Sequence, residues 1–178
     1  MQTELVSNEK RSRVLEYLLE HPTEEIKIRK IAAKLKLNPG FVSVFIKKLR
    51  KERIVKKESV DKNSSMVKAW KILFNISKIT KHLNKLLRIK SIDGIGIYGS
   101  WAIGTNNEES DIDLWIKVKK YPEAIEIARI RKVIRENVGV EPSIMIITKE
   151  KMEELKRKNP PIYFSLMHSF HLWGENVD

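Results

Sequence analysis

Two aspartates, Asp111 and Asp113, are separated by a single isoleucine in the stretch DIDLWIKV. If this stretch is a β-strand, both side chains point to the same face, because alternate residues of a strand do so. Two neighbouring carboxylates repel each other, and they are costly to bury unless a cation or a partner offsets their charge. Oxygen ligands of this kind suit Mg²⁺ or Mn²⁺. The spacing therefore predicts a metal site formed by Asp111 and Asp113.

A Gly-Ser pair, Gly99-Ser100, precedes the aspartates by about a dozen residues. Glycine lets the main chain approach a phosphate closely, and Ser100 would add a hydroxyl and a main-chain N–H at the start of a helix. Ser110 comes directly before the aspartates. An Asp-x-Asp alone is weak evidence, since aspartates at strand ends are often only solvated. The combination predicts a nucleotide site that includes Gly99, Ser100 and Ser110.

The elements around these residues follow from their periodicity. SIDGIGIYGS predicts a strand that ends at the Gly-Ser pair, and WAIGT can begin a helix. DIDLWIKV predicts a second strand. PEAIEIARIRKVIRENV predicts a crossover helix that begins at Pro122, and SIMIIT predicts a buried strand in the same sheet as the aspartates.

The stretch GSWAIGTNNEESDIDLWI resembles the signature of the DNA polymerase beta nucleotidyltransferase superfamily, and in particular its minimal nucleotidyltransferases. Gly99, Ser100, Asp111 and Asp113 match the pattern, and the resemblance extends from about Ile92 to the C-terminus. It implies a mixed sheet with helices on one side, and two metal ions held by the aspartates. It also implies transfer of a nucleotidyl group from a nucleoside triphosphate, with ATP as the expected donor and pyrophosphate as the leaving group.

Two positions depart from the family pattern. Met145 stands where an acidic residue is usual, and Ile103 stands where many relatives have a basic residue near the phosphates. Glu141 shares the strand parity of Met145, but it lies four residues earlier, about 13 Å away along a strand, with Pro142 between them. The departures leave open whether the site turns over substrate.

The net positive charge of the chain comes entirely from its first half. The net charge is +12; residues 1–90 contain 23 Lys and Arg against 9 Asp and Glu, whereas residues 91–178 contain 12 against 14. A basic half favours nucleic-acid binding, since phosphate contacts dominate such affinity. The alternative is a solvated Lys/Glu-rich surface of the kind that thermophile proteins carry.

Composition also excludes several classes of protein. There is no cysteine, so neither a disulfide framework nor a thiolate metal site is available. No apolar stretch approaches the roughly 20 residues of a membrane span. The first residues, MQTELVSNEKR, lack the apolar segment of a signal peptide. We therefore expect a cytoplasmic protein.

The first half has the order of a winged helix-turn-helix domain. EKRSRVLEYLLEHP, IKIRKIAAKLKL and FVSVFIKKLRKERI each have apolar residues at helical spacing, and Asn38, Pro39 and Gly40 form the turn between the last two. IVKKES and MVKAWKILF predict two strands, so residues 54–74 would form the β-hairpin that makes the wing. A small helical bundle is the alternative interpretation.

In winged helices the third helix enters the major groove. The face that it would present here lacks Arg, Asn and Gln near its start, so phosphate contacts, strong salt dependence and modest sequence preference are expected. Phe41 and Val44 could instead form a protein-binding patch. The expected DNA-binding residues are Phe41, Ser43, Lys47, Lys48, Lys51, Lys56 and Lys57.

The sequence thus predicts an α+β protein in three parts: a winged helix-turn-helix in residues 1–75, a basic connecting helix in 76–90, and a nucleotidyltransferase fold in 91–178. The connecting helix could dimerise, extend the DNA surface or pack between the halves. Two functions remain open: a metal-dependent nucleotidyltransferase, which the aspartates favour, and a DNA-binding regulator whose second half senses nucleotide or mediates association. The acceptor is open as well, with a protein, a toxin-like partner and a second copy of the chain among the candidate partners.

Overall fold

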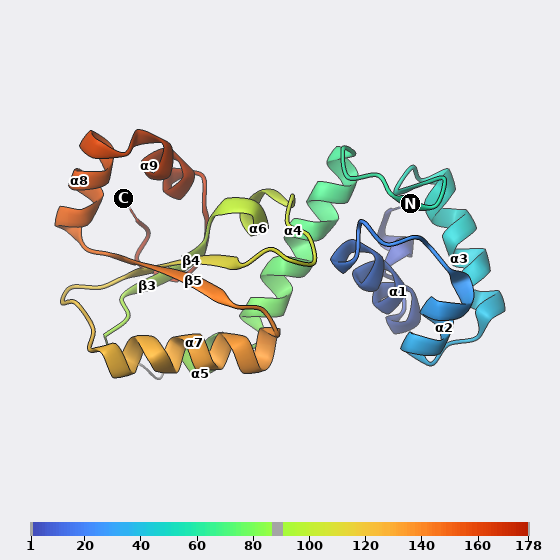
Figure 1. Cartoon of the computed structure of the whole chain (residues 1–178), viewed down its shortest axis with the longest axis horizontal. Coiled ribbons are helices and arrows are strands. Elements are labelled where there is room, and N and C mark those ends of the chain that lie inside the picture. The colour runs from blue at the N-terminus through green and yellow to red at the C-terminus, as the bar shows by residue number, and fades with distance from the viewer. Residues whose placement is uncertain (1, 87–90, 178) are drawn as a thin grey trace. The chain divides into compact units, whose positions relative to one another are not determined.

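The computed structural model describes residues 2–86 and 91–177. The chain divides into two compact units, Met1–Lys71 and Ile72–Asp178. Figure 1 shows the elements of each unit along the chain.

The first unit contains the three predicted helices. They are α1 (Glu9–Glu20), α2 (Ile28–Leu35) and α3 (Pro39–Lys51), preceded by a short 3₁₀ helix, η1 (Gln2–Leu5). The Asn8 side chain caps α1 by accepting from the N–H of Arg11, and the Asn38 side chain caps α3 by accepting from the N–H of Gly40. The apolar faces of the three helices meet in a core that includes Leu15, Leu18, Ile31, Phe45, Ile46 and Leu49.

The hairpin is shorter than predicted. It consists of β1 (Val55–Lys56) and β2 (Ser59–Val60), with Val55 paired to Val60. The prediction of a strand over MVKAWKILF was wrong, because these residues belong to the helix α4 (Ser65–Thr80). Four residues of α4 are buried at intervals of four, which is the helical period: Val67, Lys71, Asn75 and Ile79. The apolar run concealed that period, since it includes residues on both sides of the helix.

The expected single helix over residues 76–90 was also wrong. Residues 76–80 are the last turn of α4, the chain then turns at Lys81 and His82, and α5 (Leu83–Leu86) follows. Residues 87–90 of that prediction lie outside the described residues. The two units divide between Lys71 and Ile72, so α4 is the element that both units share.

The second unit contains a four-stranded mixed sheet. Its strands are β3 (Gly94–Ile97), β4 (Ile112–Lys117), β5 (Pro142–Ile147) and β6 (Phe170–Gly174), in the order β5-β4-β3-β6. β4 pairs with β5 in parallel, while β3 pairs antiparallel with both β4 and β6. The predicted crossover helix is α7 (Ala124–Val138), which connects the two parallel strands. The expected mixed sheet is confirmed.

Alternation along β4 directs side chains to two different layers. Ile112, Leu114 and Ile116 pack into a cluster that also contains residues of α4, α5 and α7. Trp115 points to the opposite face and packs with residues of α8 (Lys149–Lys158) and α9 (Pro160–Met167). The helices α4, α5 and α7 therefore pack on one face of the sheet, as expected, whereas α8 and α9 pack on part of the opposite face (Figure 1).

Along residues 2–86 and 91–177, no helix has the length and apolar character needed to cross a membrane.

Candidate nucleotidyltransferase site

The Gly-Ser pair forms the turn between β3 and the short helix α6 (Gly99–Ile103), as the sequence predicts. Gly99 has a φ of +65°, a conformation that side chains disfavour. A Cβ on this residue would lie 2.3 Å from Oδ2 of Asp113. The N–H of Tyr98 donates to the main-chain oxygen of Asp113 at 3.0 Å, which ties the turn to β4. The two ends of the sequence motif therefore meet in space.

Asp111 and Asp113 also lie close enough to affect each other. Asp113 is half-buried on β4, and Asp111 is exposed just before this strand. Burial raises the pKa of the Asp113 carboxyl, a hydrogen bond from Ser143 opposes the rise, and the negative charge of Asp111 adds to it. Among the residues that the structure describes, no group of three or more His, Cys, Asp and Glu could hold a metal. The candidate metal ligands remain the two predicted carboxylates.

Ser143 is a site residue that the sequence analysis missed. It is the direct partner of Asp113 in the parallel pairing of β4 and β5, and its hydroxyl opposes the rise in the pKa of both the Asp113 carboxyl and the Tyr98 phenol. The sequence offers one signal, since Ser143 lies two residues before Met145 and so shares its face of the strand. The strand register is needed to place it beside Asp113. The strand β5 has no acidic residue, and beside Asp113 it presents the hydroxyl group of Ser143.

Met145 lies two pairs further along β5, opposite Trp115, and packs against the cluster around this indole. Glu141 does not replace the missing acid. Its carboxylate forms two hydrogen bonds with the guanidinium of Arg135, of 2.6 and 2.7 Å. The expectation that Glu141 lies outside the site agrees with this ion pair.

The remaining predicted nucleotide-binding residues lie around the loop between α6 and β4. Ser100 is half-buried in the first turn of α6, and its main-chain oxygen accepts from the N–H of Thr105 at 3.0 Å. The Ser110 hydroxyl accepts from the N–H of Asn107 and donates to its Oδ1, both at 2.9 Å, so it closes the turn before the aspartates. Ile103 is 55% exposed at the end of α6. Nucleotide binding by Ser100 and Ser110 stays a prediction.

The candidate DNA-binding residues lie on α3 and the hairpin of the first unit. Lys47, Lys51 and Lys57 are exposed, whereas Lys48 forms an ion pair with Glu4 and Lys56 forms one with Asp61 at 2.8 Å. Ser43 is half-buried, and Phe41, also half-buried, stacks on Phe45. Val44 is 70% exposed next to them. Their contact with DNA stays a prediction.

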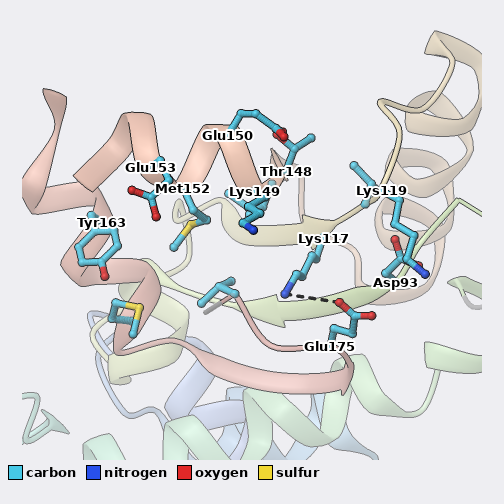
Figure 2. A pocket seen from close by; sticks show the side chains of 14 residues that line it. Asp93, Lys117, Lys119, Thr148, Lys149, Glu150, Met152, Glu153, Tyr163 and Glu175 are labelled. Atoms are coloured by element: carbon cyan, nitrogen blue, oxygen red, sulfur yellow. Dashed lines mark ion pairs between the residues drawn. The ribbon is translucent and has the colours of Figure 1, made fainter. Parts of the chain in front are cut away.

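A cavity of about 480 Å³ lies at the other end of β4 from Asp113. Figure 2 shows its charged lining. Lys117 pairs with Glu175 at 3.5 Å, and Lys119 pairs with Asp93 at 3.7 Å. The sequence gives no sign of this cavity, because its lining comes from several segments that meet only in the fold. Most of its charge is neutralised within the protein.

Comparisons with known proteins agree with both units. Residues 76–167 match the family model of the nucleotidyltransferase domain, and residues 8–57 match that of the arsR family of bacterial regulatory proteins. Because the first match covers more than half of the chain, this protein belongs to the nucleotidyltransferase domain family. It carries an N-terminal helix-turn-helix domain of DNA-binding type. No curated protein matches the chain.

Some solved structures are similar to part of the chain. One is a toxin–antitoxin complex with AMP-PNP, at 18% identity and a TM-score of 0.41, covering 54% of this chain and 73% of the other. Another is the tri-AMPylated HEPN toxin of Shewanella oneidensis with the MNT antitoxin, at 15% identity and a TM-score of 0.39, covering 58% and 73%. At these levels neither structure bears on what this chain binds or modifies.

Proposed function

We propose that this protein transfers a nucleotidyl group from a nucleoside triphosphate, with ATP as the expected donor, in a reaction that depends on Mg²⁺. The observation that carries the proposal is the approach of the Gly99 turn to the Asp113 carboxylate, where a Cβ would lie 2.3 Å from Oδ2. A main-chain turn suited to phosphate and a carboxylate suited to a cation share one place, and a metal-bound triphosphate needs both.

The residues present fit Mg²⁺. This ion usually keeps several waters and binds through one or two carboxylates together with substrate phosphates, so a third acid is not required. Asp111 and Asp113 would hold it, and a cation would offset the burial and the repulsion by Asp111 that raise the pKa of Asp113. Bound Mg²⁺ supplies neutralisation of the triphosphate charge and activation of the attacking hydroxyl.

The chain's own residues would then orient the reaction. Gly99 and Ser100 would offer main-chain N–H groups to the phosphates. The Ser143 hydroxyl would hold the Asp113 carboxylate in a defined rotamer through its hydrogen bond. The helix-turn-helix domain would bind DNA, with Lys47, Lys51 and Lys57 on phosphates.

Transfer of label from α-labelled ATP tests the proposal. The wild-type protein is incubated with Mg²⁺ and with protein, RNA and DNA acceptors, and Asp113→Asn should abolish transfer while DNA binding persists. Asp93→Asn is the matched control, because Asp93 pairs with Lys119 at the opposite end of the sheet and should leave transfer unchanged. A wild type that neither binds Mg²⁺–ATP nor transfers label would exclude the enzyme.

The second candidate function is a DNA-binding regulator with a silent nucleotidyltransferase domain. Met145 favours it, since this residue packs against the Trp115 cluster and offers no ligand to a metal. In that case the same assay finds DNA binding and association of the chain without transfer.

A further inference from the structure

Two buried asparagines connect the helix α4 with the loop between α6 and β4. Asn75 on α4 is 8% exposed, and Asn106 in the loop is 7% exposed. The Nδ2 group of Asn75 donates to the main-chain oxygen of Trp101 at 2.9 Å and to Oδ1 of Asn106 at 3.0 Å. One side-chain amide thus bonds both the site helix and the loop that follows it.

The bond to Trp101 satisfies a carbonyl near the end of a short helix. The last carbonyls of any helix lack partners within the helix, and α6 is only five residues long. It ends at Gly104, which has a φ of +68°. The surroundings are apolar, since Ile79, Trp101 and Ile112 belong to the same core cluster. If Asn75 were changed, the Trp101 oxygen and the Asn106 side chain would each lose this hydrogen bond. Water could not readily replace the bonds in such apolar surroundings.

We propose that Asn75 is a positioning residue for the nucleotide site. The segment from Gly104 to Ser110 joins the end of α6 to Asp111, so its placement positions Ser110 and the end of α6 relative to the aspartates. Asn75 holds this segment at Asn106 and holds α6 at Trp101, without touching the nucleotide itself. The inference rests on the proposed nucleotidyltransferase function.

The test removes the Nδ2 donor and keeps the shape of the side chain. Asn75→Asp replaces the Nδ2 donor with an oxygen at almost the same volume, and the ionised carboxylate would repel the Trp101 and Asn106 oxygens. Asn137→Asp is the control: its Nδ2 donates to the Val133 oxygen at 2.7 Å on α7, in the same unit, so the variant loses one donor bond and keeps its contact with Lys85. Hydrogen exchange of residues 104–111 and the Kd for Mg²⁺–ATP are measured in the full chain.

Asn75→Asp should speed exchange in residues 104–111 at least tenfold and weaken Mg²⁺–ATP binding about tenfold, with exchange in α7 unchanged. Asn137→Asp should do neither. Asn106→Ala, which leaves the bond to Trp101, should give a smaller effect and serves if Asn75→Asp fails to fold.

Three outcomes would overturn the proposal: unchanged loop exchange, wild-type affinity in Asn75→Asp, or faster exchange spread equally over α7, which marks a purely structural role. Failure of the proposed function is distinguishable. If the wild type binds no Mg²⁺–ATP, the exchange of residues 104–111 still decides whether Asn75 positions the loop.

Discussion

At the scale of single residues, the site depends on a glycine that serves two purposes. Gly99 adopts a positive φ, and the missing Cβ leaves room for the Asp113 carboxylate. Gly139 also adopts a positive φ, of +77°, but without the second purpose, since a Cβ there would meet nothing within 4 Å. Comparing alanine substitutions at the two glycines therefore distinguishes the cost of backbone strain from the cost of the contact with Asp113.

We therefore expect Gly139→Ala to cost about 1 kcal/mol of unfolding free energy, from the backbone alone. Gly99→Ala should cost about 2–4 kcal/mol, because the carboxylate must also move, and it should abolish Mg²⁺-dependent nucleotide binding. Urea denaturation and thermal shifts with Mg²⁺–ATP measure both effects. Equal costs at the two glycines would contradict the close approach.

The raised pKa of Asp113 predicts a pH dependence. The pKa of this carboxyl is higher in the folded than in the unfolded protein, so its ionisation disfavours folding. Its contribution to the free energy of unfolding therefore falls as the pH rises from the unfolded-state pKa to the folded-state pKa. Asp113→Asn should therefore raise the melting temperature of the metal-free protein at pH 7, and the difference from wild type should shrink towards pH 3. The variant should lose stabilisation by Mg²⁺. A variant less stable than wild type at pH 7 would indicate a structural role for the carboxylate.

At the scale of elements, the register of β5 against β4 decides which residue lies next to the aspartates. Asp113 pairs with Ser143, and Trp115 pairs with Met145. An acid at position 143 would thus lie beside Asp113, whereas an acid at position 145 would enter the cluster around Trp115. The register therefore separates two otherwise similar substitutions.

We expect Ser143→Asp to tighten Mg²⁺ binding, and to lower the stability of the metal-free protein through repulsion with Asp113. Met145→Asp should instead cost about 1–3 kcal/mol with or without metal, because it places a carboxylate among apolar side chains. Calorimetric titration with Mg²⁺ and denaturation in its presence distinguish the two variants. Tighter Mg²⁺ binding by Met145→Asp alone would favour position 145 as the missing ligand.

At the scale of the whole molecule, the two units differ in charge and in the function that we propose for each. The basic residues concentrate in the first half of the chain, and the carboxylate site lies in the second unit. The helix α4 belongs to both units, and it is where sequence-based interpretation failed most clearly. We therefore expect substitutions in the first unit to affect the proposed DNA binding, and substitutions in the second unit to affect the proposed nucleotidyl transfer.

Lys47→Ala in the full chain should weaken binding to all duplex sequences by a similar factor and reduce the salt dependence by about one phosphate contact. Lys132→Ala on α7 is the control, an exposed lysine of the second unit, and should leave DNA affinity unchanged. Fluorescence anisotropy at several salt concentrations measures both. A loss confined to one DNA sequence would instead indicate base contacts by α3.

The sequence by itself determined the features that depend on local spacing. The turn at Asn38, the strands at both ends of the Gly-Ser motif and the helix α7 follow from patterns a few residues long. The approach of Gly99 to Asp113 was implied by the motif, but the clash that requires glycine appeared only in the fold.

Tertiary structure alone decided the rest. It decided that α4 is a helix. It also decided two sets of contacts between residues that are distant in sequence: the pairing of Ser143 with Asp113, and the bonds of Asn75 to Trp101 and Asn106. A strand's own alternation fixes which residues share a face, but its register against a neighbour depends on how the whole sheet packs. An apolar run such as MVKAWKILF suits a strand or a helix, and burial at Val67 and Ile79 selects the helix.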